Sequence, residues 1–126
     1  MRQEIRVEGL NPPISHYTDA VRHGDLLFIS GIGPLDAGMK VVGGDDVAEQ
    51  ARQVFRNMEQ ILKAADLGFG NILRVTVYLL DVNDRHRINP VRQEYFGATR
   101  PASTLFGVAQ LAIPGMKIEI EAVAGY

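Results

Sequence analysis

Apolar residues recur at helical spacing in one long segment of the chain, residues 47–65. Asp45 or Asp46 precedes it as a helix cap, and Gly68 lies just past its end. This spacing predicts an amphipathic helix with one face buried in a core. The apolar positions of that face are Val47, Ala51, Val54, Phe55, Met58, Ile61, Leu62 and Ala65.

Alternating apolar and polar positions predict strands on both sides of this helix. In residues 72–80, Val75, Val77 and Leu79 fall on one side, and Arg74, Thr76 and Tyr78 fall on the other. Residues 17–22 and 26–30 are expected to form a hairpin around His23-Gly24-Asp25. The other predicted pieces are a short strand at residues 5–7, a loop at 31–44 with a short extra strand at 39–42, and closing strands at 104–110 and 116–124.

A second, shorter helix is predicted from Asn89 to Gly97. Asn89-Pro90 fits a cap followed by proline at the first helical position, where the missing N–H is not needed. Val91, Tyr95 and Phe96 would then face the core, and residues 81–87 would form a separate turn.

The order hairpin, helix, strand, helix, hairpin predicts an α+β fold in which two helices cover only one face of the sheet. In residues 116–124 the apolar Ile118, Ile120 and Ala122 alternate with Lys117, Glu119, Glu121 and Val123. The helix-free face would therefore carry a mixture of apolar and acidic side chains. We expect subunit contacts to cover it, with clefts between subunits.

Composition narrows the class of protein. The 126 residues, 46% of them hydrophobic, are predicted to form a single domain, residues 1–126. A formal net charge of −2 argues against nucleic-acid or membrane partners. Zero cysteines exclude thiol chemistry, and the lack of a long apolar run favours a cytoplasmic location.

Most common chemical motifs are not supported. The three histidines lack the spacing of metal ligands, so we expect no metal, and Gly31-Ile32-Gly33 lacks the third glycine of a dinucleotide loop, so we expect no cofactor. Arg85-His86-Arg87 with Arg92 is interpreted as a solvated basic turn.

Several short sequence motifs along nearly the whole chain resemble those of the reactive intermediate deaminase family, the Rid or YjgF-type proteins. The most specific is the closing phrase Lys117-Ile118-Glu119-Ile120-Glu121-Ala122-Val123-Ala124. The others are Tyr17, Ile29-Ser30-Gly31 with Pro34, Ala51-Arg52-Gln53, Asp81-Val82-Asn83-Asp84, Asn89 with Tyr95-Phe96, and Pro101-Ala102-Ser103.

This resemblance implies a chorismate-mutase-like fold, a homotrimer with a central barrel, and small-molecule clefts at the subunit interfaces. Members of known activity hydrolyse enamines and imines such as 2-iminopropanoate to the keto acid and ammonia. By resemblance, Glu119 is the candidate acid, base or water-holding residue. The candidate ligand-binding residues are Tyr17, Ser30, Gly31, Asn89, Arg100, Ser103 and Thr104. Three of these have plain structural alternatives: Asn89 as a helix cap, Ser30 as a strand-end residue, and Glu119 as a solvated or ion-paired strand position.

One position departs from the deaminating members. Their arginine, two residues after the proline of the Pro-Ala phrase, clamps the substrate carboxylate, and here that position is Ser103. Loss of such a pair removes roughly 1.5–3 kcal/mol, about one to two orders of magnitude in affinity. Arg100, three residues upstream, would point to the opposite face of a regular strand.

Three functions from different classes remain open. The first is a hydrolytic deaminase for an imine or enamine other than the usual 2-imino acids. The second is a ligand-binding trimer without catalysis. The third is the endoribonuclease or translation inhibitor of an older family naming, against which the mild acidity of the chain argues.

Overall fold

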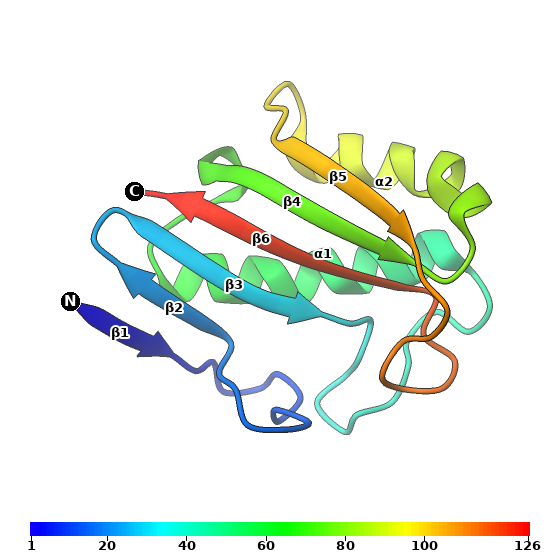
Figure 1. Ribbon diagram of the computed structural model, residues 1–126, viewed down its shortest axis with the longest axis horizontal. Coiled ribbons are helices and arrows are strands. Elements are labelled where there is room, and N and C mark those ends of the chain that lie inside the picture. Colours follow the sequence, from blue (N-terminus) through cyan, green and yellow to red (C-terminus); the bar gives the residue numbers. More distant parts are fainter.

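Six strands form one mixed β-sheet in the computed structural model, which describes all 126 residues (Figure 1). The strand order is β1-β2-β3-β6-β4-β5; β4 and β5 are parallel, and every other neighbouring pair is antiparallel. The predicted α+β class is confirmed. The strands are β1 (Arg2–Ile5), β2 (Ala20–His23), β3 (Leu26–Ile32), β4 (Ile72–Leu79), β5 (Ala102–Gly107) and β6 (Ile118–Gly125).

Two α-helices pack on one face of this sheet, behind it in Figure 1: α1 (Val47–Ala64) and α2 (Arg85–Phe96). The cap of α1 is Asp46, whose carboxylate accepts from the backbone N–H of Ala48 at 3.0 Å. Short 3-10 turns, η1 (Phe69–Asn71) and η2 (Val82–Asp84), precede β4 and α2. No helix combines the length and apolar character that a membrane crossing requires.

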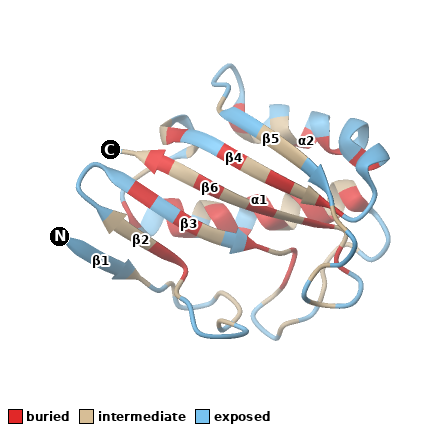
Figure 2. Ribbon diagram, in the orientation of Figure 1, coloured by how far each residue is buried: buried red, intermediate tan, exposed pale blue.

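The core lies between the helices and the sheet. Buried residues alternate with more accessible ones along much of β3, β4 and β6, as Figure 2 shows, because successive side chains of a strand point to opposite faces. Phe55 of α1 is 1% exposed, and its ring lies 5.2 to 5.9 Å from the rings of Phe69, Tyr95 and Phe96. This aromatic cluster joins the two helices beside β4.

The start of α2 corrects the sequence prediction. The helix begins at Arg85, not after Asn89, so Asn89 lies inside the helix and Pro90 is an interior proline. The 3-10 turn ahead of it explains the difference, because the carboxylate of Asp81 accepts from the N–H of Asn83 and starts the helical run earlier. Pro90 gives up one hydrogen bond on the exposed side of the helix.

Side-chain hydrogen bonds also shift strand boundaries from their predicted places. The first strand is Arg2–Ile5 rather than residues 5–7, because the N–H of Val7 donates to Asp19 at 2.8 Å. The last strand begins at Ile118 because the N–H of Lys117 donates to the buried side chain of Gln50 at 2.7 Å.

Three further boundaries differ. The strand predicted at 17–22 is β2, which begins at Ala20, so Tyr17 lies in the loop before it. Strand β5 runs from Ala102 to Gly107 rather than over 104–110. The predicted strand at 39–42 is reduced to one isolated bridge between Leu35 and Val41.

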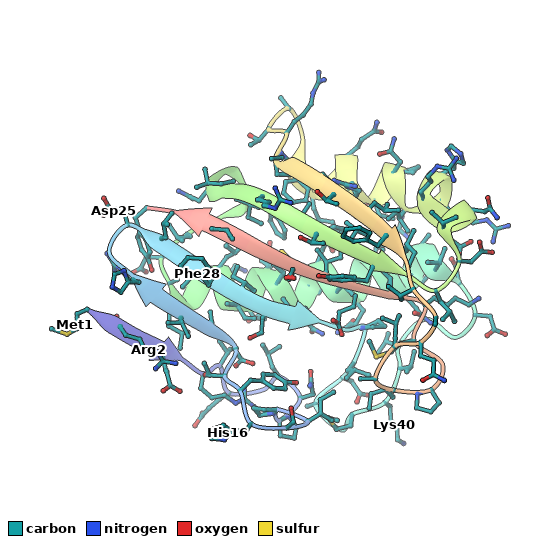
Figure 3. All side chains as sticks on the ribbon, viewed as in Figure 1. Met1, Arg2, His16, Asp25, Phe28 and Lys40 are labelled. Atoms are coloured by element: carbon teal, nitrogen blue, oxygen red, sulfur yellow. The ribbon has the colours of Figure 1, made fainter.

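The face of the sheet away from the helices carries the expected mixture of side chains. Phe28 is 48% exposed and lies on the side turned toward the viewer in Figure 3. Tyr78 stacks on Phe106 with ring centroids 6.2 Å apart and donates its hydroxyl to Glu121 at 2.8 Å. This hydrogen bond, with burial and the charges of Glu121 and Glu119, raises the pKa of Tyr78. A single chain leaves these aromatic side chains uncovered.

Candidate functional site

A bulge in β3 brings its backbone against the carboxylate of Glu119. The pairing of β3 with β6 shifts between Ile29 and Ile32, so Ser30 and Gly31 leave the regular register. A Cβ atom at Gly31 would lie 2.6 Å from Oε2 of Glu119. Glycine at position 31 therefore allows the carboxylate to pack directly against the strand.

Four of the residues singled out from the sequence line one pocket. Tyr17, Ser30, Gly31 and Glu119 share an open pocket of about 510 Å³, here called the Glu119 pocket, with Ile14 on its wall. They also line a smaller adjoining cavity of about 50 Å³. The loop before β2 supplies Tyr17, the bulge supplies Ser30 and Gly31, and β6 supplies Glu119.

Hydrogen bonds fix the walls of this pocket. The hydroxyl of Ser30 donates to the carbonyl of Thr18 at 2.6 Å, so its proton is engaged and its lone pairs remain available to a donor. The hydroxyl of Tyr17 accepts from the N–H of Ile14 at 3.2 Å and keeps its own proton for another acceptor. The pocket thus offers a carboxylate, a phenol and a hydroxyl oxygen within one concave surface.

Burial raises the pKa of Glu119 above its ordinary value, and the nearby charge of Glu121 raises it further. Glu119 forms none of the salt bridges in the chain, so no cation offsets this effect. A carboxyl group with a raised pKa is a stronger base than an ordinary glutamate, and so takes a proton from water more readily.

Three other candidates line a second open pocket of about 890 Å³, here called the Arg92 pocket. Its wall includes Asn89 and Arg92 of α2 together with Arg100 and Ser103. Arg100 and Ser103 share this pocket, contrary to the expectation from regular strand geometry, because Arg100 precedes the first residue of β5.

The structure corrects the interpretation of Arg92 as part of a solvated basic turn: Arg92 lies inside α2, is half-buried, and donates from Nη2 to the hydroxyl of Ser103 at 2.9 Å. Thr104 lies elsewhere: its hydroxyl accepts from Nη2 of Arg74 at 3.0 Å, because successive strand residues face opposite sides.

The two pockets lie apart within one chain. Ser103 pairs with Val75, which pairs with Ala122, whereas Glu119 pairs with Tyr78. Ser103 is thus two strands away from Glu119 and three residues further along, roughly 10 Å in the strand direction alone. Figure 1 shows the start of β5 at the upper edge of the sheet and the end of β3 near the lower right. One copy of the chain does not bring both groups to one small molecule.

No three histidine, aspartate or glutamate side chains converge closely enough to bind a metal ion.

The profile of the protein family described as Endoribonuclease L-PSP matches residues 9–126. The chain belongs to this family. The Endoribonuclease L-PSP family includes the Rid and YjgF-type proteins, so the resemblance stated from the sequence is confirmed. That Ser103 occupies the clamping position of the deaminating members stays a prediction.

Several known proteins are similar to the chain in sequence or in structure. Human 2-iminobutanoate/2-iminopropanoate deaminase is 42% identical over 113 residues, which cover 88% of this chain and 80% of that protein. A Rid family protein of unknown function from Yersinia pestis has a TM-score of 0.93 at 26% identity, with 100% of both chains covered. The crystal structure of E. coli TdcF with bound serine has a TM-score of 0.90 at 33% identity, with 98% of both chains covered. The YjgF-type fold is therefore shown.

Proposed function

We propose that the chain hydrolyses a small imine or enamine to a carbonyl compound and ammonia, with Glu119 as the proton-transferring residue. The observation that carries this proposal is the Glu119 carboxylate, with its raised pKa, in a pocket shared with Tyr17, Ser30 and Gly31. The similarity to a human imino-acid deaminase supports the same class of reaction.

In the proposed reaction, ionised Glu119 takes a proton from water as the water oxygen bonds to the imine carbon. The C=N double bond becomes a single bond, and the nitrogen takes the proton that Glu119 received from water. Ionised Glu119 then takes the proton of the new hydroxyl group and passes it to the nitrogen as the C–N bond breaks and C=O forms, so that ammonia leaves. The lone pairs of Ser30 and the proton of Tyr17 are available to orient the water or the substrate in this pocket.

We propose that the working form is a homotrimer whose clefts combine the Glu119 pocket of one copy with the Arg92 pocket of the next. The exposed aromatic side chains of the helix-free face and the separation of the two pockets support this arrangement. Sedimentation equilibrium should give three times the mass of one chain, which is 13.9 kDa. A monomer at micromolar concentration would contradict the shared cleft.

A ligand-binding trimer without catalysis is the main alternative. The serine bound to TdcF supports a small amino-acid-like ligand for either function. The family description also names an endoribonuclease, but the net charge of −2 gives little long-range attraction for RNA. We therefore expect a small-molecule substrate rather than a nucleic acid.

Ammonia release from freshly generated 2-iminopropanoate tests the proposed hydrolysis. The native chain should release ammonia above the uncatalysed rate but more slowly than the human deaminase. Ser103→Arg should raise kcat/KM roughly tenfold or more, because it adds a charge-assisted pair to the substrate carboxylate. The matched control is Thr104→Arg, whose side chain lies outside the Arg92 pocket.

Two results would count against these statements. A native rate equal to that of the human deaminase would show that Ser103 does not limit the use of this substrate. No ammonia from the native chain or from Ser103→Arg, with several small imines, would exclude hydrolysis and favour the ligand-binding alternative.

A further inference from the structure

Arg92 is a half-buried cation that forms none of the salt bridges in the chain. Its polar contact is the hydrogen bond to the hydroxyl of Ser103 at 2.9 Å. Burial lowers the pKa of Arg92, since no carboxylate offsets the loss of water around its guanidinium. Withdrawing a charge from water without a counter-charge is unfavourable, and an anionic ligand would remove that penalty.

The helix places Arg92 at a position that ordinarily faces a core. Ile88 lies one turn before it and Phe96 one turn after it, and these side chains are 1% and 8% exposed. Residues four apart share a helix face, so Arg92 rises from the apolar stripe of α2 and is directed toward the start of β5 rather than into open water.

The side chains that line the pocket around Arg92 are cationic or neutral. Besides Asn89, Ser103 and Arg100, the Arg92 pocket is lined by Gln93, Thr99 and small or apolar residues, and no aspartate or glutamate takes part. Arg100 also forms no salt bridge. Two arginines, a hydroxyl and two amides around an open space match the donors that bind an oxyanion.

A carboxylate suits this pocket better than a phosphate. The pocket includes Phe96 and Gly97 at the C-terminal end of α2, where the helix dipole is negative and disfavours a doubly charged anion. A single guanidinium fork with a neighbouring hydroxyl matches the two oxygens of a carboxylate.

From these contacts we infer that Arg92, assisted by Ser103 and Arg100, binds the carboxylate of a small ligand from helix α2. Arg92 thereby performs, from a different element, the task that position 103 does not perform in this chain. The inference rests on the proposed function for the identity of the reacting group, but carboxylate binding itself is testable without turnover. It also narrows the substrate to an imine or enamine that carries a carboxylate.

Calorimetric titration of the 126-residue chain with pyruvate tests this site. Arg92→Gln should weaken pyruvate binding roughly tenfold or more, and Arg92→Lys should have an intermediate effect because it retains the charge without the fork. Arg56→Gln, which removes an exposed arginine from α1, is the matched control for net charge and should bind pyruvate as the native chain does. Pyruvamide, the uncharged analogue, should bind weakly to all four proteins.

Several outcomes would overturn the inference. These are no pyruvate binding by the native chain, equal affinity in Arg92→Gln, equal affinity for pyruvamide, or tighter binding of inorganic phosphate at the same site. Thermal unfolding of each variant establishes that the compared proteins are folded. If Arg92 only tied α2 to β5, Arg92→Gln would lower the unfolding temperature without changing the preference for pyruvate over pyruvamide.

Pyruvate binding and ammonia release, measured on the same variants, distinguish the carboxylate site from the proposed hydrolysis. Arg92-dependent pyruvate binding without ammonia release would support the carboxylate site and contradict hydrolysis. Ammonia release that is unaffected by Arg92→Gln, in kcat and in KM, would support hydrolysis and contradict the carboxylate site.

Discussion

Glu119→Gln is expected to lower ammonia release from 2-iminopropanoate by roughly a hundredfold to ten-thousandfold, the usual contribution of a positioned general base. The amide has nearly the shape of the carboxylate but cannot take a proton from water. Because the carboxylate packs against the backbone at Gly31 and the amide is nearly the same size, glutamine should fit without disturbing the bulge. The loss should therefore appear in kcat more than in KM, measured with a coupled ammonia assay.

Glu121→Gln is the matched control, because Glu121 lies two residues away on the same strand and face. Its amide oxygen can still accept from the hydroxyl of Tyr78. We expect its maximal rate to stay within a few-fold of the native rate. If Glu121→Gln were as inactive as Glu119→Gln, the proposed role of Glu119 would not be supported.

The dependence of kcat/KM on pH gives a second test of Glu119, with Glu121→Gln as the informative variant. Glu119 acts in its ionised form, so kcat/KM should fall as the pH drops through its pKa, which burial and Glu121 raise above the ordinary value. Glu121→Gln removes the like charge and leaves burial in place. The acidic limb of its pH profile should therefore move to lower pH, and a shift to higher pH would contradict this assignment.

Phe55→Ala is expected to lower the free energy of unfolding by about 3–5 kcal/mol, a large part of the stability of a typical small domain. Phe55 is 1% exposed, and its ring contacts the rings of Phe69, Tyr95 and Phe96. The substitution removes the central ring of this cluster and leaves a cavity between α1 and α2. Urea unfolding at one fixed chain concentration measures the change, because the stability of the proposed trimer would depend on concentration.

Val82→Ala provides the comparison for Phe55→Ala. Val82 is 42% exposed in the short turn η2, so its truncation should change the free energy of unfolding by less than about 1 kcal/mol. A loss below about 1 kcal/mol for Phe55→Ala would mean that the aromatic cluster repacks and does not hold the helices together.

The spacing of apolar residues predicted most of the fold. This spacing reflects helices and strands that bury only one face, and the helices and strands of the structure do so. The apolar stripe of α1 and the alternation in β4 and β6 lie where predicted. The errors arose where side chains replace backbone partners: Asp19 at the end of β1, Gln50 at the start of β6 and Asp81 ahead of α2. The bonds of Asp19 and Gln50 join positions 12 and 67 residues apart, which local patterns do not record. The bond of Asp81 is a local turn bond, and the prediction missed it because Asn89-Pro90 offered a second helix start.

The candidate site was predictable only in part. Family phrases led to Tyr17, Ser30, Gly31 and Glu119, which the structure brings into one pocket. Arg92 was assigned to a solvated basic turn, because a helix beginning at Asn89 is too short to show that Arg92 interrupts an apolar stripe. With the helix starting at Arg85, an arginine one turn after a buried isoleucine would have been a visible signal.

The division of the polar groups between two pockets has a genetic consequence. In a trimer with the proposed shared clefts, a copy that has lost Glu119 still contributes Arg92 to the cleft with one neighbour. A copy that has lost Arg92 still contributes Glu119 to the cleft with the other neighbour. Alleles damaged in different pockets could then complement one another within a mixed trimer, whereas two alleles damaged in the same pocket could not. In such a trimer, the separation of Ser103 from Glu119 within one copy would determine which pairs of inherited defects rescue each other.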